Sequence, residues 1–331
     1  MDQDKLPLIT TVIPVYNHET YVIESIRSVI GQSYPKIELI VINDGSKDRS
    51  HEMVLTLVEE CRQRFVRFEY ITRENRGLST TLNQALVMAR GKYLGLLASD
   101  DMILSDKFRC LVEALEPTDD SCAGAFGKAS FIDEQGRATH LDAKGNVHEQ
   151  QSDETYGDFL DLYTREQTVD YKTHFGNYLS LLGGNYLPAM SSLLKTATVR
   201  EVGGWTAGNI LEDWEMWLKL SKHHNFIFID KTMALYRVHG KNTFYTMKPQ
   251  MEHAALMLLA REREYCTSNG LDRAWQDSFY GILYRIVRFG DVPIKDRLRE
   301  FHHLELPDVL PFISFIARAR CATFLRKWSR R

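Results

Sequence analysis

The first hundred residues repeat one pattern: an apolar run that suits a buried strand, a short polar loop, and a helix with one apolar face. Apolar runs at 8–15, 37–42 and 66–71 are each followed by apolar residues at helical spacing. This close alternation predicts an α/β class with a mostly parallel sheet and helices on both faces. The loops after the strands should then share one edge of the sheet; they contain Tyr16-Asn17, Asp44-Gly45, residues 73–77 and Asp100-Asp101.

A fourth apolar run, at 93–97, leads to two adjacent carboxylates, Asp100 and Asp101. Open α/β sheets bind ligands in the crevice outside the carboxyl ends of their strands, and hard oxygen donors there suit Mg²⁺ or Mn²⁺ bridging phosphates. The alternative is a solvated turn, with an aspartate capping the helix that begins near Asp106. Taken alone, the motif leaves both interpretations open.

The alternation weakens after residue 122. Residues 133–155 are polar and contain glycine, which indicates an excursion or mobile loop, and residues 226–230 and 233–238 suggest two further strands. From residue 250 onward the pattern is helical. We therefore expect one domain over residues 1–245 and a helical C-terminal region over residues 246–331.

Composition excludes several function classes. A net charge of −3 argues against nucleic acid as a partner. Five cysteines at no paired spacing indicate reduced thiols rather than a disulfide or zinc framework. The polar beginning of the chain does not resemble a signal peptide, and no apolar run reaches the length of about 18 residues typical of a membrane-spanning helix. These features predict a cytoplasmic protein.

Four motifs occur in a fixed order along the chain. They are Ile13-Pro14-Val15-Tyr16-Asn17, Val41-Ile42-Asn43-Asp44-Gly45-Ser46, Ala98-Ser99-Asp100-Asp101 and Glu212-Asp213-Trp214. Together they resemble glycosyltransferase family 2, inverting enzymes of the Rossmann-like GT-A fold that use nucleotide-diphosphate sugars. The resemblance covers roughly residues 6–245. Two positions depart from it: Ala98 stands where many members have a further aspartate, and Leu82 stands where many have a basic residue.

The resemblance implies a nucleotide site in the loops at the sheet edge. The residues implied are Pro14, Val15, Tyr16, Asn17, Asp44, Arg73, Arg76, Ser99 and Asp100. Asp44 matches the residue that accepts hydrogen bonds from the base or ribose, and Tyr16 matches one that stacks on the base. Arg73 and Arg76 have guanidinium groups that suit phosphate oxygens. The plainer alternatives are a turn or helix cap for Asp44, loop packing for Tyr16, and a solvated loop for the arginines.

The same resemblance implies a divalent cation, Mn²⁺ or Mg²⁺. Asp100, Asp101 and His239 match its ligands, and which of the two aspartates is the direct ligand stays open. The cation would neutralise the charge that develops on the diphosphate leaving group without consuming a proton. A lone histidine in a loop is more often a surface residue, which is the alternative for His239.

Inversion needs a base that takes the proton of the attacking hydroxyl, and Asp213 matches the family's base. Glu212 is the alternative, and either acid would also suit a helix N-terminus. Trp205 and Trp214 could bind the acceptor because aromatic faces suit sugar rings, although core packing is their commoner role. Processive members of the family carry a Gln-x-x-Arg-Trp motif, which this chain lacks. The resemblance therefore implies a non-processive enzyme of hexosyltransferase type, which adds one sugar per encounter.

The tail at 311–331 contains no acidic residue and alternates aromatic with basic side chains, as an interfacial helix does. From this we expect a peripheral enzyme at the inner face of a bacterial cytoplasmic membrane. There it would extend a glycan or lipid-linked acceptor in cell-surface polysaccharide synthesis, such as O-antigen or capsule. The alternative is a helix packed on the protein itself.

Two other functions deserve comparison. A sugar-phosphate nucleotidyltransferase has a related sheet and also uses a divalent metal, but it normally carries a glycine-rich loop after the first strand, and residues 14–18 contain no glycine. A non-catalytic carbohydrate-binding protein on the same fold is suggested only by Ala98 and Leu82.

Overall fold

The computed structural model describes residues 6–164, 174–289, 295, 300–304 and 306–328. The chain divides into two compact units: Met1–Leu181 with Asn185–Gly240, and Leu182–Gly184 with Lys241–Arg331. The division thus falls after Gly240, close to the boundary expected after residue 245. Each unit has fully buried apolar side chains of its own, such as Ile13 in the first and Leu259 in the second.

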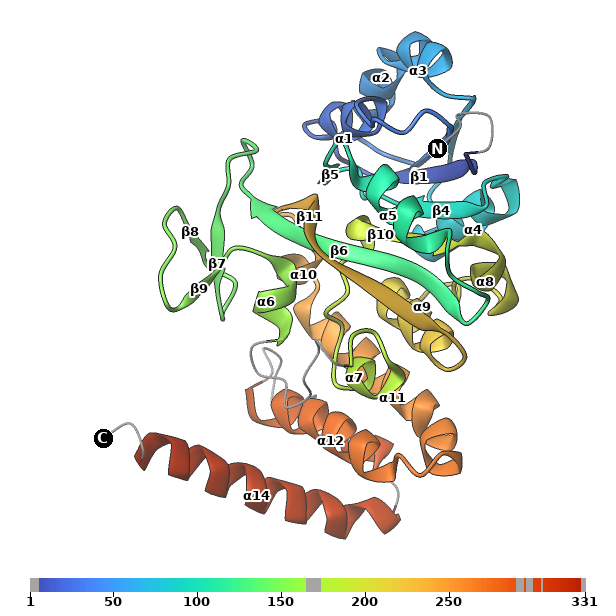
Figure 1. The fold of residues 1–331 in the computed structure, drawn as a ribbon. Coiled ribbons are helices and arrows are strands. Elements are labelled where there is room, and N and C mark those ends of the chain that lie inside the picture. Colours follow the sequence, from blue (N-terminus) through green and yellow to red (C-terminus); the bar gives the residue numbers. More distant parts are fainter. Residues whose placement is uncertain (1–5, 165–173, 290–294, 296–299, 305, 329–331) are drawn as a thin grey trace. The chain divides into compact units, whose positions relative to one another are not determined.

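An eight-stranded sheet runs through the first unit in the order β3-β2-β1-β4-β10-β6-β11-β5 (Figure 1). The strands are β1 (Ile9–Val15), β2 (Ile37–Asp44), β3 (Arg67–Arg73), β4 (Tyr93–Leu96), β5 (Met102–Ile103), β6 (Cys122–Ile132), β10 (Ser192–Lys195) and β11 (Asn225–Arg237). β1 to β4 pair in parallel, and β11 is parallel to β6. Because β10 is antiparallel to both β4 and β6, the strands β6 and β11 run in the same direction as β4. The predicted mostly parallel α/β sheet is confirmed.

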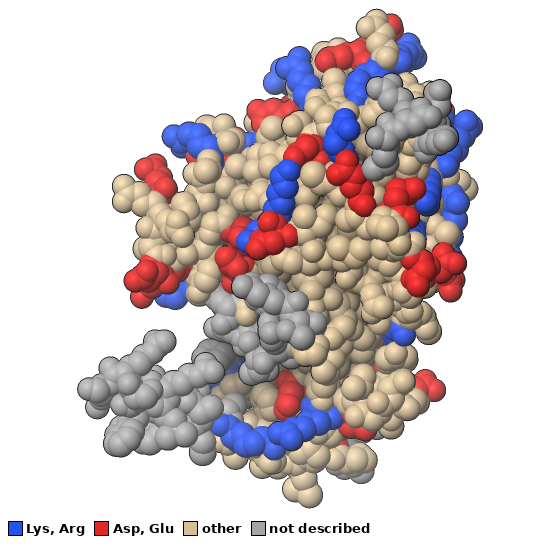
Figure 2. All heavy atoms as spheres, in the orientation of Figure 1, with Lys and Arg blue, Asp and Glu red and all other residues tan. Residues whose placement is uncertain are grey.

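The apolar runs of the sequence form the central strands because a parallel sheet covered by helices is buried on both faces. β2 is buried along its whole length, and α1 buries Val22, Ile26 and Val29. The helices of this unit are α1 (Val22–Ile30), α2 (Ser50–Leu55), α3 (Val58–Arg64), α4 (Leu78–Met88), α5 (Lys107–Leu115), α6 (Phe159–Thr164), α7 (Tyr178–Leu182), α8 (Thr196–Glu201) and α9 (Glu212–Ser221), with a 3₁₀ turn η2 (Ala189–Ser191). Acidic and basic side chains are interspersed on the face drawn in Figure 2.

Two sequence expectations were wrong in detail. Residues 133–155 are not a loop alone: they contribute to a small antiparallel sheet, ordered β8-β7-β9, made of β7 (His140–Asp142), β8 (Val147–His148) and β9 (Thr155–Tyr156). The two strands expected at 226–238 are one strand, β11, whose pairing with β6 shifts register between Phe228 and Ala234. The polar residues at that irregularity interrupt the apolar pattern without ending the strand.

The second unit is helical, as expected, and consists of α10 (Thr243–Thr246), α11 (Lys248–Ser268), α12 (Asp272–Phe289) and α14 (Val309–Trp328), with the 3₁₀ turns η3 (Glu300–His303) and η4 (Leu306–Asp308). Trp275 of α12 is buried and donates its indole N–H to the carbonyl of Leu259 at 2.6 Å. Arg263 and Tyr280 both bind the buried carboxylate of Asp308, at 2.6 and 2.9 Å. Among the described residues, every helix is too short or too polar to cross a lipid bilayer.

The beginning of the basic tail packs on the second unit itself. Phe312 is buried, with its ring centroid 5.5 Å from that of Tyr280, and Phe315 lies 6.4 Å from Tyr284. Part of the aromatic face that the sequence suggested for a membrane is therefore used in helix packing. Leu310 and Ile313 of α14 are exposed. Side chains from residue 319 onward, including those of Phe324, Leu325 and Trp328, lie outside the described residues.

Candidate functional site

The carboxyl ends of β1, β2, β4 and β11 meet at one edge of the sheet, and hydrogen bonds join the loops that follow β1 and β2. Asn17 donates its backbone N–H to Ser46 Oγ at 3.0 Å and accepts the N–H of Lys47 on Oδ1 at 2.7 Å. It has a φ of 57°, a left-handed conformation that asparagine tolerates better than most residues. Asn17 thus has a structural role beside its expected nucleotide role, and it sets the direction in which the loop continues.

The three residues before Asn17 differ in exposure. Val15 is fully buried and Pro14 is half-buried, which matches loop and strand packing. The Tyr16 side chain is 48% exposed, so its ring is available to a ligand. Of the three, Tyr16 is the one whose placement suits stacking on a base.

Asp44 ends β2 as a buried carboxylate held by the last residue of β3 and by the loop that follows β3. Its Oδ1 accepts a hydrogen bond from the Arg73 guanidinium and another from the backbone N–H of Arg76 at 2.9 Å. Arg73 also donates to Gln84 Oε1 at 2.9 Å and to Thr81 Oγ1 at 2.8 Å. Arg73 is therefore occupied in fixing Asp44, whereas the Arg76 side chain is exposed. Both described bonds to Asp44 end on Oδ1, which leaves Oδ2 as the oxygen that can face a ligand.

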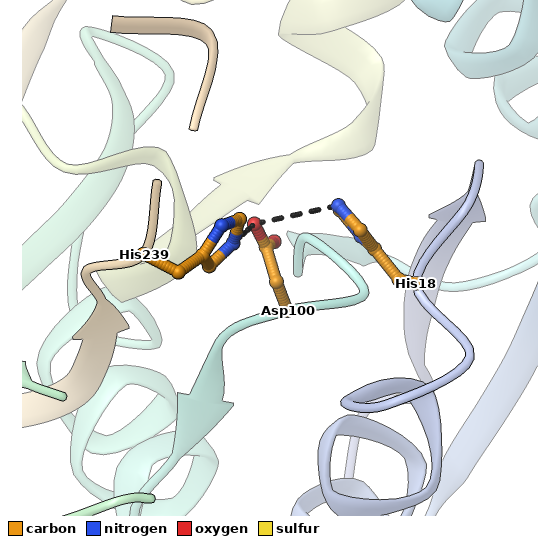
Figure 3. A group of neighbouring side chains, drawn as sticks. All are labelled: His18, Asp100 and His239. Atoms are coloured by element: carbon orange, nitrogen blue, oxygen red, sulfur yellow. Dashed lines mark hydrogen bonds and ion pairs between the residues drawn. The ribbon is translucent and has the colours of Figure 1, made fainter. Parts of the chain in front are cut away.

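Asp100 lies between two histidines from different segments (Figure 3). Its Oδ2 is 3.1 Å from Nε2 of His239, which follows β11, and 3.7 Å from Nε2 of His18, which follows β1. His18 Nδ1 is in turn 2.8 Å from the hydroxyl of Ser99. The ligand atoms of these three residues all lie within 4.8 Å of one another, as in a site that holds a metal ion. Burial raises the pKa of Asp100, but the hydrogen bond from His239 and the positive charges of His18 and His239 outweigh it and hold that pKa below its ordinary value.

Asp101 is placed differently from Asp100, although the two are adjacent in the chain. Its Oδ1 accepts the backbone N–H of Arg237 at 2.9 Å, and it is not part of the group formed by His18, Asp100 and His239. Burial and then the charge of Asp100 raise the pKa of Asp101 well above its usual range. The structure therefore separates the two carboxylates into one that faces two imidazoles and one that joins the turn to β11.

Arg237 connects the parts of this site. Its side chain is fully buried, and Nε donates to the backbone carbonyl of Asp100 at 2.9 Å. Its guanidinium also binds Glu24 and lies 4.9 Å from the ring centroid of Tyr21. The Tyr21 ring stacks on the His239 imidazole, with 5.0 Å between the two ring centroids. The buried Arg237 side chain thus fixes the turn that contains Asp100 and, through the Tyr21 ring, the His239 imidazole that faces Asp100.

The acidic pair Glu212 and Asp213 begins α9 in the same unit. Both are half-buried, and Asp213 Oδ2 accepts a hydrogen bond from the Asn185 side chain at 2.8 Å. Burial raises the pKa of Asp213. Burial, and after it the charge of Asp213, raise the pKa of Glu212 to about 8. Glu212 is therefore expected to carry a proton at neutral pH.

The two tryptophans expected at the acceptor site are buried. Trp205 is 4% and Trp214 6% exposed, and Trp214 donates its indole N–H to the carbonyl of Leu181 at 2.8 Å. Asn83 binds the backbone N–H and carbonyl of Trp205 at 2.9 and 2.6 Å. Their burial fits core packing, the alternative to a sugar-stacking role, because stacking requires an accessible ring face.

Comparison with known proteins decides the family. The family model described as glycosyl transferase family 2 matches residues 10–175, which include the loops bearing Asn17, Asp44 and Asp100. The chain belongs to glycosyltransferase family 2. His239 and Asp213 lie beyond the matched part, so their placement rests on the fold and not on the match.

Relatives and solved structures agree with membership of glycosyltransferase family 2. An uncharacterized glycosyltransferase of Rickettsia typhi is 26% identical over 248 residues, which is 74% of this chain and 69% of the relative. TarS 1–349 of S. aureus in complex with UDP matches with a TM-score of 0.56 and 17% identity, covering 90% of this chain and 79% of that TarS fragment. The mannosyltransferase PcManGT of Pyrobaculum calidifontis, in complex with GDP-Man and Mn²⁺, matches with a TM-score of 0.58 and 14% identity. The match covers 99% of this chain and 85% of the PcManGT chain. These likenesses confirm the GT-A fold.

Sequence reasoning did not find His18 and Arg237, two residues of this candidate site. His18 directly follows Tyr16-Asn17 in a loop already expected at the site, and this position in the sequence could have identified it as a site residue. Arg237 lies two residues before His239 at the end of a strand, but arginine in a strand gives no sign that it will be buried. Its role depends on partners, Asp100 and Glu24, that are far away in the sequence.

Replacing Arg237 tests its positioning role. We expect Arg237→Lys to weaken Mn²⁺ binding by about 10- to 100-fold, the usual cost of losing a residue that orients metal ligands, because lysine cannot hold Asp100 and Glu24 at once. Mn²⁺ affinity is measured by calorimetry, with circular dichroism to confirm folding. The matched control is Glu24→Gln, which changes the half-exposed partner and should cost less. Equal Mn²⁺ affinity in folded Arg237→Lys and wild type would contradict the positioning role.

The raised pKa of Glu212 predicts a pH-dependent stability. The folded protein holds this proton more tightly than an unfolded chain does, so the stabilisation is present below the ordinary pKa of 4.5 and is lost as pH rises through about 8. We expect the Tm of the wild type to fall by roughly a few degrees more than that of Glu212→Gln between about pH 6 and pH 9. Thermal unfolding followed across this range checks it. Parallel Tm curves for the two proteins would show that Glu212 titrates normally.

Proposed function

We propose that this chain is a metal-dependent, inverting glycosyltransferase of hexosyltransferase type, which moves one sugar per encounter from a UDP-sugar to a glycan acceptor. The observation that carries the proposal is the position of Asp100 between His18 and His239, at the carboxyl edge of a family 2 sheet. The neighbours in structure include complexes with UDP, with UDP-GlcNAc and with GDP-Man and Mn²⁺, which supports a nucleotide-sugar donor.

The donor would lie along the loops after β1, β2 and β4. Tyr16 supplies an exposed ring for the base, and Asp44 supplies an oriented carboxylate for the base or ribose. Arg76 has the exposed guanidinium suited to phosphate oxygens, while Arg73 acts indirectly by holding Asp44. The Ser99 hydroxyl contacts His18 Nδ1 and would help to orient that imidazole beside the donor's diphosphate.

The residues at Asp100 fit a divalent cation, because one carboxylate oxygen and two imidazole nitrogens converge there. We propose Asp100 as the direct aspartate ligand, with His239 and His18 as its partners. Imidazole ligands favour a transition-metal ion such as Mn²⁺ over Mg²⁺, which prefers oxygen. The bound cation would offset charge on the diphosphate leaving group. Asp101, bound to the Arg237 N–H, would keep the turn in place.

Asp213 is proposed as the base that accepts the proton of the acceptor hydroxyl. Asn185 fixes Oδ2 at 2.8 Å, and the backbone N–H of Trp214 binds Oδ1 at 2.7 Å, so the carboxylate is oriented by two donors. Its raised pKa brings it closer to neutral pH, where proton acceptance from a hydroxyl is more effective. Glu212, which holds its proton up to about pH 8, is the less suitable base of the two.

The acceptor is proposed to be a lipid-linked glycan of bacterial surface polysaccharide synthesis, with this enzyme docked at the inner face of the cytoplasmic membrane. Support comes from the acid-free tail at 311–331 and from the exposed apolar side chains of Leu310 and Ile313 on α14. Basic residues near an anionic leaflet contribute on the order of 1 kcal/mol each. Apolar side chains beside them would add to reversible docking.

Vesicle sedimentation tests this docking. We expect the full chain to bind anionic vesicles better than neutral ones, and Leu310→Glu/Ile313→Glu to weaken the binding severalfold, because two exposed apolar contacts are replaced by charges that the anionic surface repels. Val87→Glu, an equally exposed apolar position in the first unit, is the control and should bind like the wild type. No preference for anionic vesicles in the wild type, or equal binding by the double variant, would contradict membrane docking by this helix.

Calorimetry with UDP, GDP and a set of nucleotide sugars, with and without Mn²⁺, tests the function. A glycosyltransferase should bind a nucleoside diphosphate and its sugar only with Mn²⁺ present, and UDP is the expected base. A nucleotidyltransferase should instead bind a nucleoside triphosphate with a sugar phosphate. A carbohydrate-binding protein should bind glycan without nucleotide, and either of these last two results would overturn the proposal.

A further inference from the structure

A second group of metal-binding side chains lies within the helical unit, in a part of the chain that the family match at 10–175 does not cover. His253 belongs to α11, and Glu300 and His303 belong to η3. His253 Nδ1 lies 3.1 Å from Glu300 Oε2, and His303 Nε2 lies 3.4 Å from the same oxygen. One donor atom from each residue lies within 4.8 Å of the other two.

These separations match the spacing of ligands around zinc. A tetrahedral Zn²⁺ with bonds of about 2.0–2.1 Å holds neighbouring ligand atoms roughly 3.3 Å apart. The two nitrogen-to-oxygen distances, 3.1 and 3.4 Å, lie on either side of this value. The donor set of two imidazoles and one carboxylate is also one that zinc accepts with a fourth position left for water.

An ordinary histidine–glutamate hydrogen bond explains only half of the group. His253 is half-exposed and makes such a bond with Glu300. His303 does not: its side chain is 12% exposed, and its Nε2 is buried with no hydrogen-bond partner. A buried polar atom without a hydrogen bond is costly, and this Nε2 lies 3.4 Å from the Glu300 carboxylate, where a cation would satisfy both groups.

We propose that His253, Glu300 and His303 bind a divalent cation of the zinc class, separate from the cation at Asp100. The cation connects η3 to α11, whose contacting residues are 47 positions apart in the chain. It would stabilise the helical unit by closing the long segment that contains α12, since a metal clip removes conformational freedom from the unfolded chain. The proposal does not depend on the glycosyltransferase activity.

Zinc binding to the full-length chain, stripped of metal by a chelator, tests the site. Asp100→Asn/His239→Asn serves as the parent variant, because it removes the other candidate site. We expect this parent to bind one Zn²⁺ by calorimetry, to gain Tm on binding, and to give the visible absorption of tetrahedral Co²⁺ when Co²⁺ replaces zinc. Adding His303→Asn should weaken zinc at least about tenfold, since even indirect ligand partners cost about 10- to 100-fold.

His253→Asn checks the result at an exposed position where misfolding is not a concern, and it should weaken zinc in the same way. His148→Asn is the control, because His148 is also exposed and pairs with an acid, Asp142, but belongs to neither of the two groups of converging metal-binding side chains found among the described residues. The proposal is overturned if the parent binds no zinc, if His253→Asn and His303→Asn leave its affinity unchanged, or if His148→Asn weakens it equally.

Discussion

Asp213→Asn is expected to lower turnover by about 10²- to 10⁴-fold while leaving donor affinity near that of the wild type. The amide keeps the size of the side chain and can still accept from Asn185 or Trp214, so the local structure should persist. It cannot accept the proton of the acceptor hydroxyl. Steady-state kinetics with the identified donor, together with calorimetric donor affinity, measure the two effects separately.

Glu212→Gln is the matched control for the base. Glu212 is expected to carry a proton at neutral pH, so its neutral isostere should retain most activity there. The opposite pattern, an inactive Glu212→Gln and an active Asp213→Asn, would assign the base role to Glu212. Loss of donor binding in Asp213→Asn would instead place Asp213 in the donor site.

Asp100→Asn should abolish metal-dependent turnover and weaken Mn²⁺ binding, because the only carboxylate in the group with His18 and His239 is removed. Charge stabilisation by a metal amounts to several kcal/mol, and each 1.4 kcal/mol corresponds to about tenfold in rate, so a loss of at least about a hundredfold is expected. Mn²⁺ calorimetry and turnover across a Mn²⁺ series provide the measurement.

Asp101→Asn distinguishes the two adjacent aspartates. Asp101 has a raised pKa and uses Oδ1 to accept the Arg237 N–H, and asparagine is a neutral residue that can do the same. We expect Asp101→Asn to keep Mn²⁺ affinity within about tenfold of the wild type, well above that of Asp100→Asn. If Asp101→Asn loses Mn²⁺ as completely as Asp100→Asn does, both carboxylates are ligands and the assignment to Asp100 alone is wrong.

The sequence predicted what depends on local pattern and chain order. The parallel strands follow from continuous apolar runs, and the common edge of Asp44, Asp100 and His239 follows from their positions at strand ends. What depends on distant partners could not be predicted. The different environments of Asp100 and Asp101 come from Arg237 and the two histidines, which lie more than about 80 residues from them along the chain.

The burial of individual aromatic rings also could not be predicted from the sequence. Trp205 and Trp214 are residue types that often bind sugars, but packing against the rest of the unit determines that their rings are buried. The same holds for Phe312, which the alternation of the tail suggested for a membrane and which instead lies against Tyr280. In both cases aromatic residue types suggested a binding surface, but residue type alone could not indicate whether a ligand or the rest of the protein covers the rings.

Release of nucleoside diphosphate from a panel of UDP- and GDP-sugars, in the presence of Mn²⁺ and lipid-linked glycan acceptors, is the most direct test of the proposed glycosyltransferase activity. We expect release of UDP from one UDP-sugar, a product whose anomeric configuration is inverted relative to the donor, and loss of both signals in Asp100→Asn and Asp213→Asn. Equal release by Asp100→Asn and wild type, or a product that retains the donor configuration, would contradict it.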